Sequence, residues 1–179
     1  MKLLYARRGN FGGSKAVYAL LEYLVALEYG IPMPEVRKHS TGKPYFPERP
    51  DIHFSLSHTK THVLCAVSDS PVGVDIETVR SIRPGVPERV CTPSELLIFD
   101  FFDLWVLKES FIKLSGNTNT PLKSICFSRA GEAIIAQDLR VRSRHYDTVP
   151  GCAAAVCSLD DDITEAIEMA DLSKILRSY

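Results

Sequence analysis

The sequence predicts an α+β fold, built as a pseudo-twofold pair of similar lobes in which one long helix packs on a small, mostly antiparallel sheet. Three observations predict it: a stretch with apolar side chains at helical spacing, short β-like segments after it, and a second occurrence of that order. No residue-by-residue repeat relates the halves, so the pseudo-symmetry rests on element order. We assign residues 1–77 to the N-terminal lobe and residues 78–179 to the C-terminal lobe of one compact unit.

The first half begins with a helix expected over residues 14–29, where apolar side chains recur at helical spacing. Ser14 is the expected N-cap, and Gly30 with Pro32 forms the stop signal. A Pro-rich connection follows. Turn-forming Ser, Thr, Asp and Pro then separate three short segments that we expect to form hairpins, at residues 52–56, 63–67 and 72–76.

A second long helix is expected from Thr92 to Gly116. Thr92 is suited to cap it, with Pro93 at the first helical position and Glu95 completing a capping box. The abundance of Leu and Phe, together with Trp105, predicts that this helix is largely buried. Strands are then expected at residues 122–127, 132–136, 139–146 and 152–157, before a polar tail to Tyr179 for which a helix is one interpretation.

The composition fits a single globular domain of 179 residues, with 45% apolar and 24% charged side chains. The 21 basic and 22 acidic residues give a net charge of −1, so the whole molecule has no signature of a nucleic-acid or membrane-surface binder. Residues 1–8 contain no apolar core long enough for a signal peptide, and no later stretch approaches about 18 uninterrupted apolar residues. We therefore expect a cytoplasmic protein without membrane association, and the duplicated layout favours a monomer.

The cysteines argue against both a disulfide framework and a zinc site. They form an odd set without C-x-x-C spacing, and most lie inside apolar runs, so we expect reduced core residues. Serine or cysteine hydrolase chemistry also fits poorly, because the chain has no G-x-S-x-G motif. The five cysteines are Cys65, Cys91, Cys126, Cys152 and Cys157.

Two carboxylates are expected side by side on the strand that begins near Val72. Alternation along this strand directs its apolar side chains to one face, and Asp75 and Glu77 to the other. Two like charges so close raise one another's pKa unless a positive charge lies between them, and a hard divalent cation would supply that charge. A solvent-exposed face of the strand explains the pattern equally well.

On the second long helix, Glu109 and Lys113 lie one turn apart on the same face. An ordinary ion pair is one interpretation. The helix is apolar nearly all round, however, and polar groups on a buried helix need a partner. The pair is therefore also a candidate functional site.

The third stretch, Phe54 to Thr59, ends a strand with groups able to contact phosphate oxygens, among them Ser57 and His58. A local cap by Ser57 or Thr59 is the alternative. Together the three stretches supply carboxylates for a metal, a cation and phosphate-contacting groups. Phosphoryl transfer on a pyrophosphate substrate uses this combination.

At these residues the chain resembles the 4'-phosphopantetheinyl transferase superfamily, in the two-lobed type that activates peptide and polyketide synthetases. The resemblance covers roughly residues 14–158, with motif-level similarity between Gly42 and Gly116. The motifs, in chain order, are Gly42-Lys43-Pro44-Tyr45-Phe46, Phe54-Ser55-Leu56-Ser57-His58-Thr59, Val72-Gly73-Val74-Asp75-Ile76-Glu77, and Trp105 through Lys113.

The resemblance implies the following site. The metal ligands for Mg²⁺ or Mn²⁺ would be Asp75, Glu77, Glu109 and Glu95. The residues that bind coenzyme A would be Lys15, Lys43, Pro44, Ser57, His58, Lys108 and Lys113. Glu109 would act as general base and Lys113 would stabilise or protonate the leaving phosphate. Glu95 keeps two candidate roles, because it also completes the capping box.

The implied reaction transfers 4'-phosphopantetheine from coenzyme A to a serine of an acyl or peptidyl carrier protein and releases 3',5'-ADP. One alternative is a Mg²⁺-dependent pyrophosphohydrolase of nucleotides or coenzyme A, with water as nucleophile. Another is a non-catalytic module that only binds coenzyme A. Arg140, Arg142 and Arg144 alternate along an expected strand, and this basic stripe is either a solvated face or a docking surface for an acidic carrier.

Overall fold

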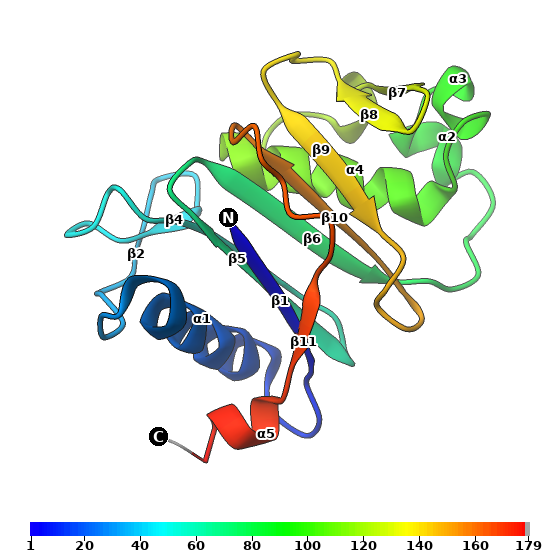
Figure 1. Cartoon of the computed structure of the whole chain (residues 1–179). Helices are drawn as coiled ribbons and strands as arrows, with labels where there is room; N and C mark the ends of the chain where they lie inside the picture. The colour runs from blue at the N-terminus through cyan, green and yellow to red at the C-terminus, as the bar shows by residue number, and fades with distance from the viewer. Residues whose placement is uncertain (178–179) are drawn as a thin grey trace.

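Two β-sheets pack together between two long helices in the computed structural model of the chain, which describes residues 1–177 (Figure 1). The α+β prediction, with long helices on small and mostly antiparallel sheets, is confirmed. The first sheet contains, in spatial order, β11 (Glu168–Ala170), β1 (Lys2–Arg7), β5 (His62–Ser68) and β4 (His53–His58). The second contains β6 (Val72–Thr78), β10 (Cys152–Ser158), β9 (Arg142–Tyr146), β8 (Ala133–Ala136) and β7 (Phe127–Ala130).

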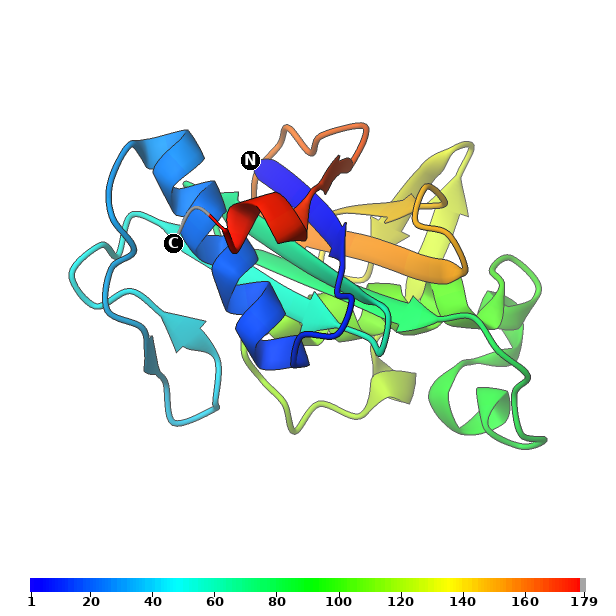
Figure 2. The same cartoon turned by 90° about the horizontal axis from the view of Figure 1, so that it is seen from below.

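The outer face of the first sheet is covered by α1 (Gly13–Tyr29), whose buried face includes Leu20, Leu21 and Leu24. The short α5 (Leu172–Ile175) lies beside α1 and adds to the same apolar core, as Figures 1 and 2 show from two directions. A small ribbon of β2 (Arg37–Lys38) and β3 (Pro44–Tyr45) lies in the connection to β4.

The outer face of the second sheet is covered by α4 (Phe101–Ser115), with Leu104 and Leu107 fully buried against it. Between the sheets lies a third apolar cluster, to which β1 and β5 contribute from one side and β6 and β10 from the other. The order of layers is therefore helix, sheet, sheet, helix. Each long helix has its own sheet, as the duplicated order of elements predicts.

The sheets meet along β4 and β6, which lie side by side and run in the same direction. The Val74 N–H donates to Ser55 Oγ at 2.9 Å, and the Ile76 N–H donates to Ser57 Oγ at 3.3 Å. Two serine side chains therefore replace the backbone ladder at this junction. Because Ser57 belongs to the Phe54–Thr59 motif, the junction also brings that motif against β6.

The expected helix from Thr92 to Gly116 is wrong as one element. The capping box of Thr92 and Glu95 forms as predicted, but it starts the short α3 (Pro93–Leu96), which follows α2 (Pro87–Val90). The backbone is extended at Asp100, and α4 begins after it. The break allows Glu95 to turn inward, where it is 2% exposed.

Other boundaries differ in smaller ways. Gly12, not Ser14, is the N-cap of α1, and its cap has no side-chain hydrogen bond. The strand expected at 122–127 is replaced by a 3₁₀ turn, η1 (Leu122–Ser124), and β7 starts only at Phe127. Residues 138–141 form a turn, so β9 starts at Arg142 instead of 139. Cys126 is exposed, whereas the other four cysteines are buried, and all five are free thiols.

The chain ends contribute to the first sheet in ways that we did not predict from the sequence. β1 lies between β5 and β11, and β11 pairs with it in parallel. The expected helical tail thus contains a strand and only one turn of α-helix, and residues 178 and 179 lie outside the described part. Strand β6 pairs with β10 in the second sheet. The lobe boundary after residue 77 stays a prediction. Within residues 1–177, no helix is long and apolar enough to cross a membrane.

Candidate active site

Gly73 allows α4 to cross β6 at very short range. A Cβ atom on Gly73 would lie 2.1 Å from the Ser110 carbonyl oxygen and 2.3 Å from the Leu114 nitrogen. Any other residue would force the helix away from the strand. Glu109 and Lys113 of α4 are therefore held close to Asp75 and Glu77, which lie on the face of β6 that α4 covers.

Asp75 is the centre of a buried polar contact between the two sheets and α4. Its Oδ1 accepts hydrogen bonds from Lys113 Nζ and from Ser57 Oγ, each at 2.7 Å. Lys113 also donates to the Leu56 carbonyl oxygen at 3.2 Å. Three of the sequence motifs, on β4, β6 and α4, thus meet at one carboxylate that is 7% exposed.

Glu109 lies on α4 next to this contact and makes no hydrogen bond or ion pair with the described residues. Burial raises its pKa above the ordinary value of 4.5, and the charges of Asp75 and Glu77 raise it further, against an opposing effect of Lys113. The side chain is half-buried. Glu109 is therefore a free carboxylate whose affinity for a proton is increased.

Glu77 lies two residues beyond Asp75 on the same face of β6. Its Oε1 accepts the Thr78 N–H at 2.8 Å and Arg80 Nη1 at 2.8 Å. The paired carboxylates expected from the Asp75-x-Glu77 pattern are thus present, but each is already engaged by a cation. Arg80 lies outside the motifs, so its contact with Glu77 was not predicted from the sequence.

Lys43 lies at the other end of this region, where α4 finishes. Its Nζ donates to the Leu114 carbonyl oxygen at 2.7 Å. Burial lowers its pKa from 10.5 to about 8. Lys43 and Pro44 line two adjoining cavities of about 240 and 440 Å³, and Lys113 lines the smaller one. A groove therefore leads from the Asp75 contact toward the Gly42-Lys43-Pro44 motif.

His58 is exposed at the end of β4 and packs against the start of α1, where a Cβ on Gly13 would lie 2.8 Å from its ring. Arg8 is nearby, since its Nη1 donates to the Thr59 carbonyl oxygen at 3.3 Å. Lys15 is exposed in the first turn of α1. The first turn of this helix contains no acidic residue, so the region favours an anion.

Lys108 and Glu95 are paired with each other inside the second lobe. Lys108 Nζ donates to Glu95 Oε2 at 2.9 Å and to the carbonyl oxygens of Val90 and Leu122, and Lys108 is 0% exposed. Glu95 Oε1 accepts the Phe127 N–H. The structure does not bring either side chain to Asp75, and their contacts anchor α3 to α4.

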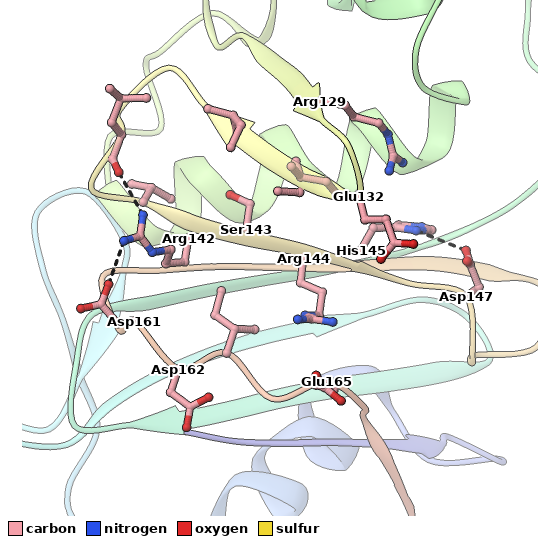
Figure 3. Close-up of a pocket in the computed structure, with 16 residues that line it drawn as sticks. Arg129, Glu132, Arg142, Ser143, Arg144, His145, Asp147, Asp161, Asp162 and Glu165 are labelled. Atoms are coloured by element: carbon pink, nitrogen blue, oxygen red, sulfur yellow. Dashed lines mark hydrogen bonds and ion pairs between the residues drawn. The ribbon is translucent and has the colours of Figure 1, made fainter.

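A cavity of about 890 Å³ lies on β8 and β9, lined by none of the predicted site residues (Figure 3). Two arginines of the expected basic stripe are paired with acids. Arg142 lines this cavity and pairs with Asp161 at 3.0 Å, and Arg140, which lies before β9 and outside the cavity, pairs with Asp138 at 2.7 Å. Arg144 lines the same cavity as Asp162 and Glu165, which Figure 3 labels. This mixture favours a solvated face over a docking surface for an acidic partner.

Comparison with known proteins identifies the family. The sequence model of the 4'-phosphopantetheinyl transferase superfamily matches residues 71–157. The 4'-phosphopantetheinyl transferase Sfp of Bacillus subtilis (strain 168) is 30% identical over 175 residues, covering 88% of this chain and 78% of the relative. The 4'-phosphopantetheinyl transferase psf-1 of Bacillus pumilus is 32% identical, covering 88% and 69%. This chain belongs to the 4'-phosphopantetheinyl transferase superfamily.

A third transferase, gsp of Aneurinibacillus migulanus, is 38% identical over 90 residues, covering 45% of this chain and 37% of the relative. The resemblance stated from the motifs is thus confirmed, and so is the prediction that the chain is an enzyme of this family. The matched range 71–157 contains β6 and α4, the elements that carry Asp75, Glu77, Glu109 and Lys113.

The transferase has the donor chemistry for a hard divalent cation, although no three His, Cys, Asp or Glu side chains among residues 1–177 are grouped to hold a metal by themselves. Mg²⁺ at such sites uses one or two carboxylates, with substrate phosphates and water completing its shell. Burial is the main cause of the raised pKa of Glu109, and the nearby charges of Asp75 and Glu77 add to it. The carboxylates Asp75, Glu77 and Glu109 therefore fit a divalent cation that binds together with a pyrophosphate substrate.

Proposed function

We infer that this transferase moves the 4'-phosphopantetheine arm of coenzyme A to a serine of an acyl or peptidyl carrier protein and releases 3',5'-ADP. The observation that supports this reaction best is the contact between Lys113 and Asp75 beside the unpaired Glu109. A cation, a bound carboxylate and a free carboxylate are thus close together at one end of a groove.

Glu109 is the proposed general base. In the reaction, the serine Oγ of the carrier forms a bond to the phosphorus next to the pantetheine, while the bond from that phosphorus to the bridging pyrophosphate oxygen breaks. The serine proton goes to Glu109, directly or through water. A carboxylate with a raised pKa holds that proton better than an ordinary one, which favours this role.

Lys113 is proposed to stabilise the leaving phosphate, because negative charge increases there as the bond breaks. Its side chain is 30% exposed, so it is accessible to a substrate. Asp75, Glu77 and Glu109 are the proposed ligands of Mg²⁺ or Mn²⁺, and such an ion would compensate charge on the pyrophosphate oxygens. Lys108 and Glu95 are left out of the proposed centre because they are buried in their own ion pair.

The nucleotide end of coenzyme A is proposed to lie along the groove that includes Lys43 and Pro44, with Ser57 and His58 contacting it and Lys15 contributing near α1. This assignment is supported by the two cavities beside Lys43 and by the exposed ring of His58. We also propose a monomer, because one chain supplies both helix-and-sheet units. Free cysteines, four of them buried, support a cytoplasmic location.

One experiment separates the candidate reactions. The protein is incubated with Mg²⁺, coenzyme A and several apo-carrier proteins, and the carriers are weighed by mass spectrometry. A mass gain of one phosphopantetheine per carrier supports transfer. Free phosphopantetheine with unmodified carriers indicates pyrophosphohydrolysis, and coenzyme A binding without either product indicates a binding module; each would contradict the proposed function.

A further inference from the structure

Arg80 connects the candidate centre to the start of α4. It lies two residues after the end of β6, and its Nη1 donates to Glu77 Oε1 at 2.8 Å and to the Thr78 carbonyl oxygen at 3.0 Å. Its guanidinium carbon lies 5.5 Å from the centre of the Phe102 ring. Three separate contacts therefore fix one side chain at the end of the strand.

These contacts fix the orientation of the Glu77 carboxylate. Oε1 receives two donors, from Arg80 and from the Thr78 N–H, whereas Oε2 has no hydrogen bond among the described residues. A carboxylate anchored by one oxygen keeps the other oxygen available. The charge of Glu77 also acts on Glu109, whose pKa it raises, so the two carboxylates influence one another.

Stability alone does not explain this arrangement. The Arg80 side chain is 61% exposed and the Glu77 side chain 30% exposed, and ion pairs of this kind contribute little to folding. A surface arginine with one flexible partner would lose rotamer freedom for a small gain. Arg80 instead has a carboxylate, a carbonyl and an aromatic ring as simultaneous partners, which favours a role in orientation.

The aromatic partner lies on the helix that carries the proposed base. Phe102 and Glu109 are seven residues apart on α4, two turns along one face. Arg80, Phe102 and Glu77 also line a cavity of about 310 Å³ beside the centre. Arg80 thus links the carboxylate on β6 to the face of α4 on which Glu109 lies.

We propose that Arg80 is a positioning residue that holds Glu77 for the divalent cation bound together with coenzyme A. This inference rests on the proposed function, because it assumes that Glu77 is a metal ligand. Carboxylate ligands are commonly oriented by hydrogen bonds from neighbouring groups, and losing such a partner weakens metal binding about 10- to 100-fold. Arg80 fills that position for Glu77.

The test measures Mn²⁺ binding by electron paramagnetic resonance, with coenzyme A present and no carrier protein. Arg80→Ala is expected to weaken Mn²⁺ binding about 10- to 100-fold. Arg80→Lys should restore part of this loss, because an ammonium can reach Glu77 but lacks the planar fork. Arg83→Ala is the matched control, since Arg83 lines the same cavity and has no bond to Glu77 in the described structure. Its Mn²⁺ affinity should equal that of the wild type.

In transfer assays, Arg80→Ala should need more Mg²⁺ for half-maximal activity and should regain most of its kcat at saturating Mg²⁺. Its melting temperature should stay close to that of the wild type, as expected for an exposed ion pair. Unchanged Mn²⁺ affinity in Arg80→Ala overturns the inference. Equal losses in Arg80→Ala and Arg83→Ala also overturn it, because they would indicate a general charge effect. A wild-type chain that binds no Mn²⁺ and modifies no carrier overturns the proposed function itself.

Discussion

Glu109 has a proton affinity set by its neighbours. Burial is the main cause of its raised pKa, followed by the charge of Asp75. In the same cluster, the Lys113 ammonium donates a hydrogen bond to Asp75. Asp75 therefore has a cationic partner, whereas Glu109 has none among the described residues. Such a difference between adjacent acids favours proton transfer at Glu109 over Asp75.

Glu109→Gln is predicted to reduce transfer at least about 100-fold, the usual contribution of a general base. The folded pKa is higher than the unfolded one, so the stability associated with the protonated carboxyl is complete below pH 4.5 and is lost as the pH rises through the raised value. The uncharged variant should therefore melt at a higher temperature than the wild type at pH 7. Calorimetry should show this difference shrinking toward pH 4.5; a variant that melts lower at pH 7 would contradict it.

Lys43 gives a second pH dependence at the residue scale. Its pKa of about 8 means that the ammonium is lost as the pH rises through that value. If Lys43 holds a phosphate of coenzyme A, the affinity of the metal-free protein for coenzyme A should fall across this range. Lys43→Arg should remove the fall, because a guanidinium stays charged. Titration calorimetry at pH values on both sides of 8 measures it, and identical slopes for the two proteins would exclude the contact.

At the scale of elements, the start of a helix could be predicted from the sequence better than its length. The Thr92–Glu95 capping box is present, yet its helix ends at Leu96, and the Glu95 carboxylate turns inward to Lys108. A capping signal marks where a helix starts and says nothing of a buried ion pair 13 residues along the chain. The exposed three-residue β11 has a weak local pattern, and only its pairing with β1 defines it.

The crossing of β6 and α4 provides a prediction about elements. Gly73→Ala would bring a methyl group into the helix backbone, and backbone atoms cannot shift as side chains do. We expect the free energy of unfolding to fall by about 3 kcal/mol or more, at or above the upper end of ordinary overpacking. Urea denaturation measures it.

Gly12→Ala is the matched control, because nothing lies within 4 Å of its added Cβ and its φ is −61°. That variant should lose no more than about 1 kcal/mol, because Gly12 is the N-cap of α1 and alanine is a poorer N-cap than glycine. If both variants lose the same stability, the close approach at Gly73 is not the cause.

For the whole molecule, the motifs predicted which residues would gather, and the structure brings Ser57, Asp75 and Lys113 into contact from three elements. They did not predict which polar residues of α4 point inward. Lys108 and Glu109 are neighbours in sequence, but they point in directions about 100° apart on the helix, and one is fully buried with Glu95. Which face of a nearly all-apolar helix packs on the sheet is decided by tertiary contacts, which no spacing encodes.

Two serines at the junction of β4 and β6 allow the contribution to stability to be measured separately from the contribution to catalysis. Ser55 and Ser57 each accept one backbone N–H of β6, and only Ser57 also binds Asp75. Each serine-to-alanine change leaves a buried N–H without its acceptor, which costs about 1–3 kcal/mol of the free energy of unfolding.

Ser55→Ala should lose that stability and keep its kcat in the transfer assay. Ser57→Ala should lose a similar amount and also transfer more slowly, because Asp75 is left with Lys113 alone. Equal kcat values for the two variants would mean that the Ser57–Asp75 hydrogen bond holds the sheets together without serving the reaction.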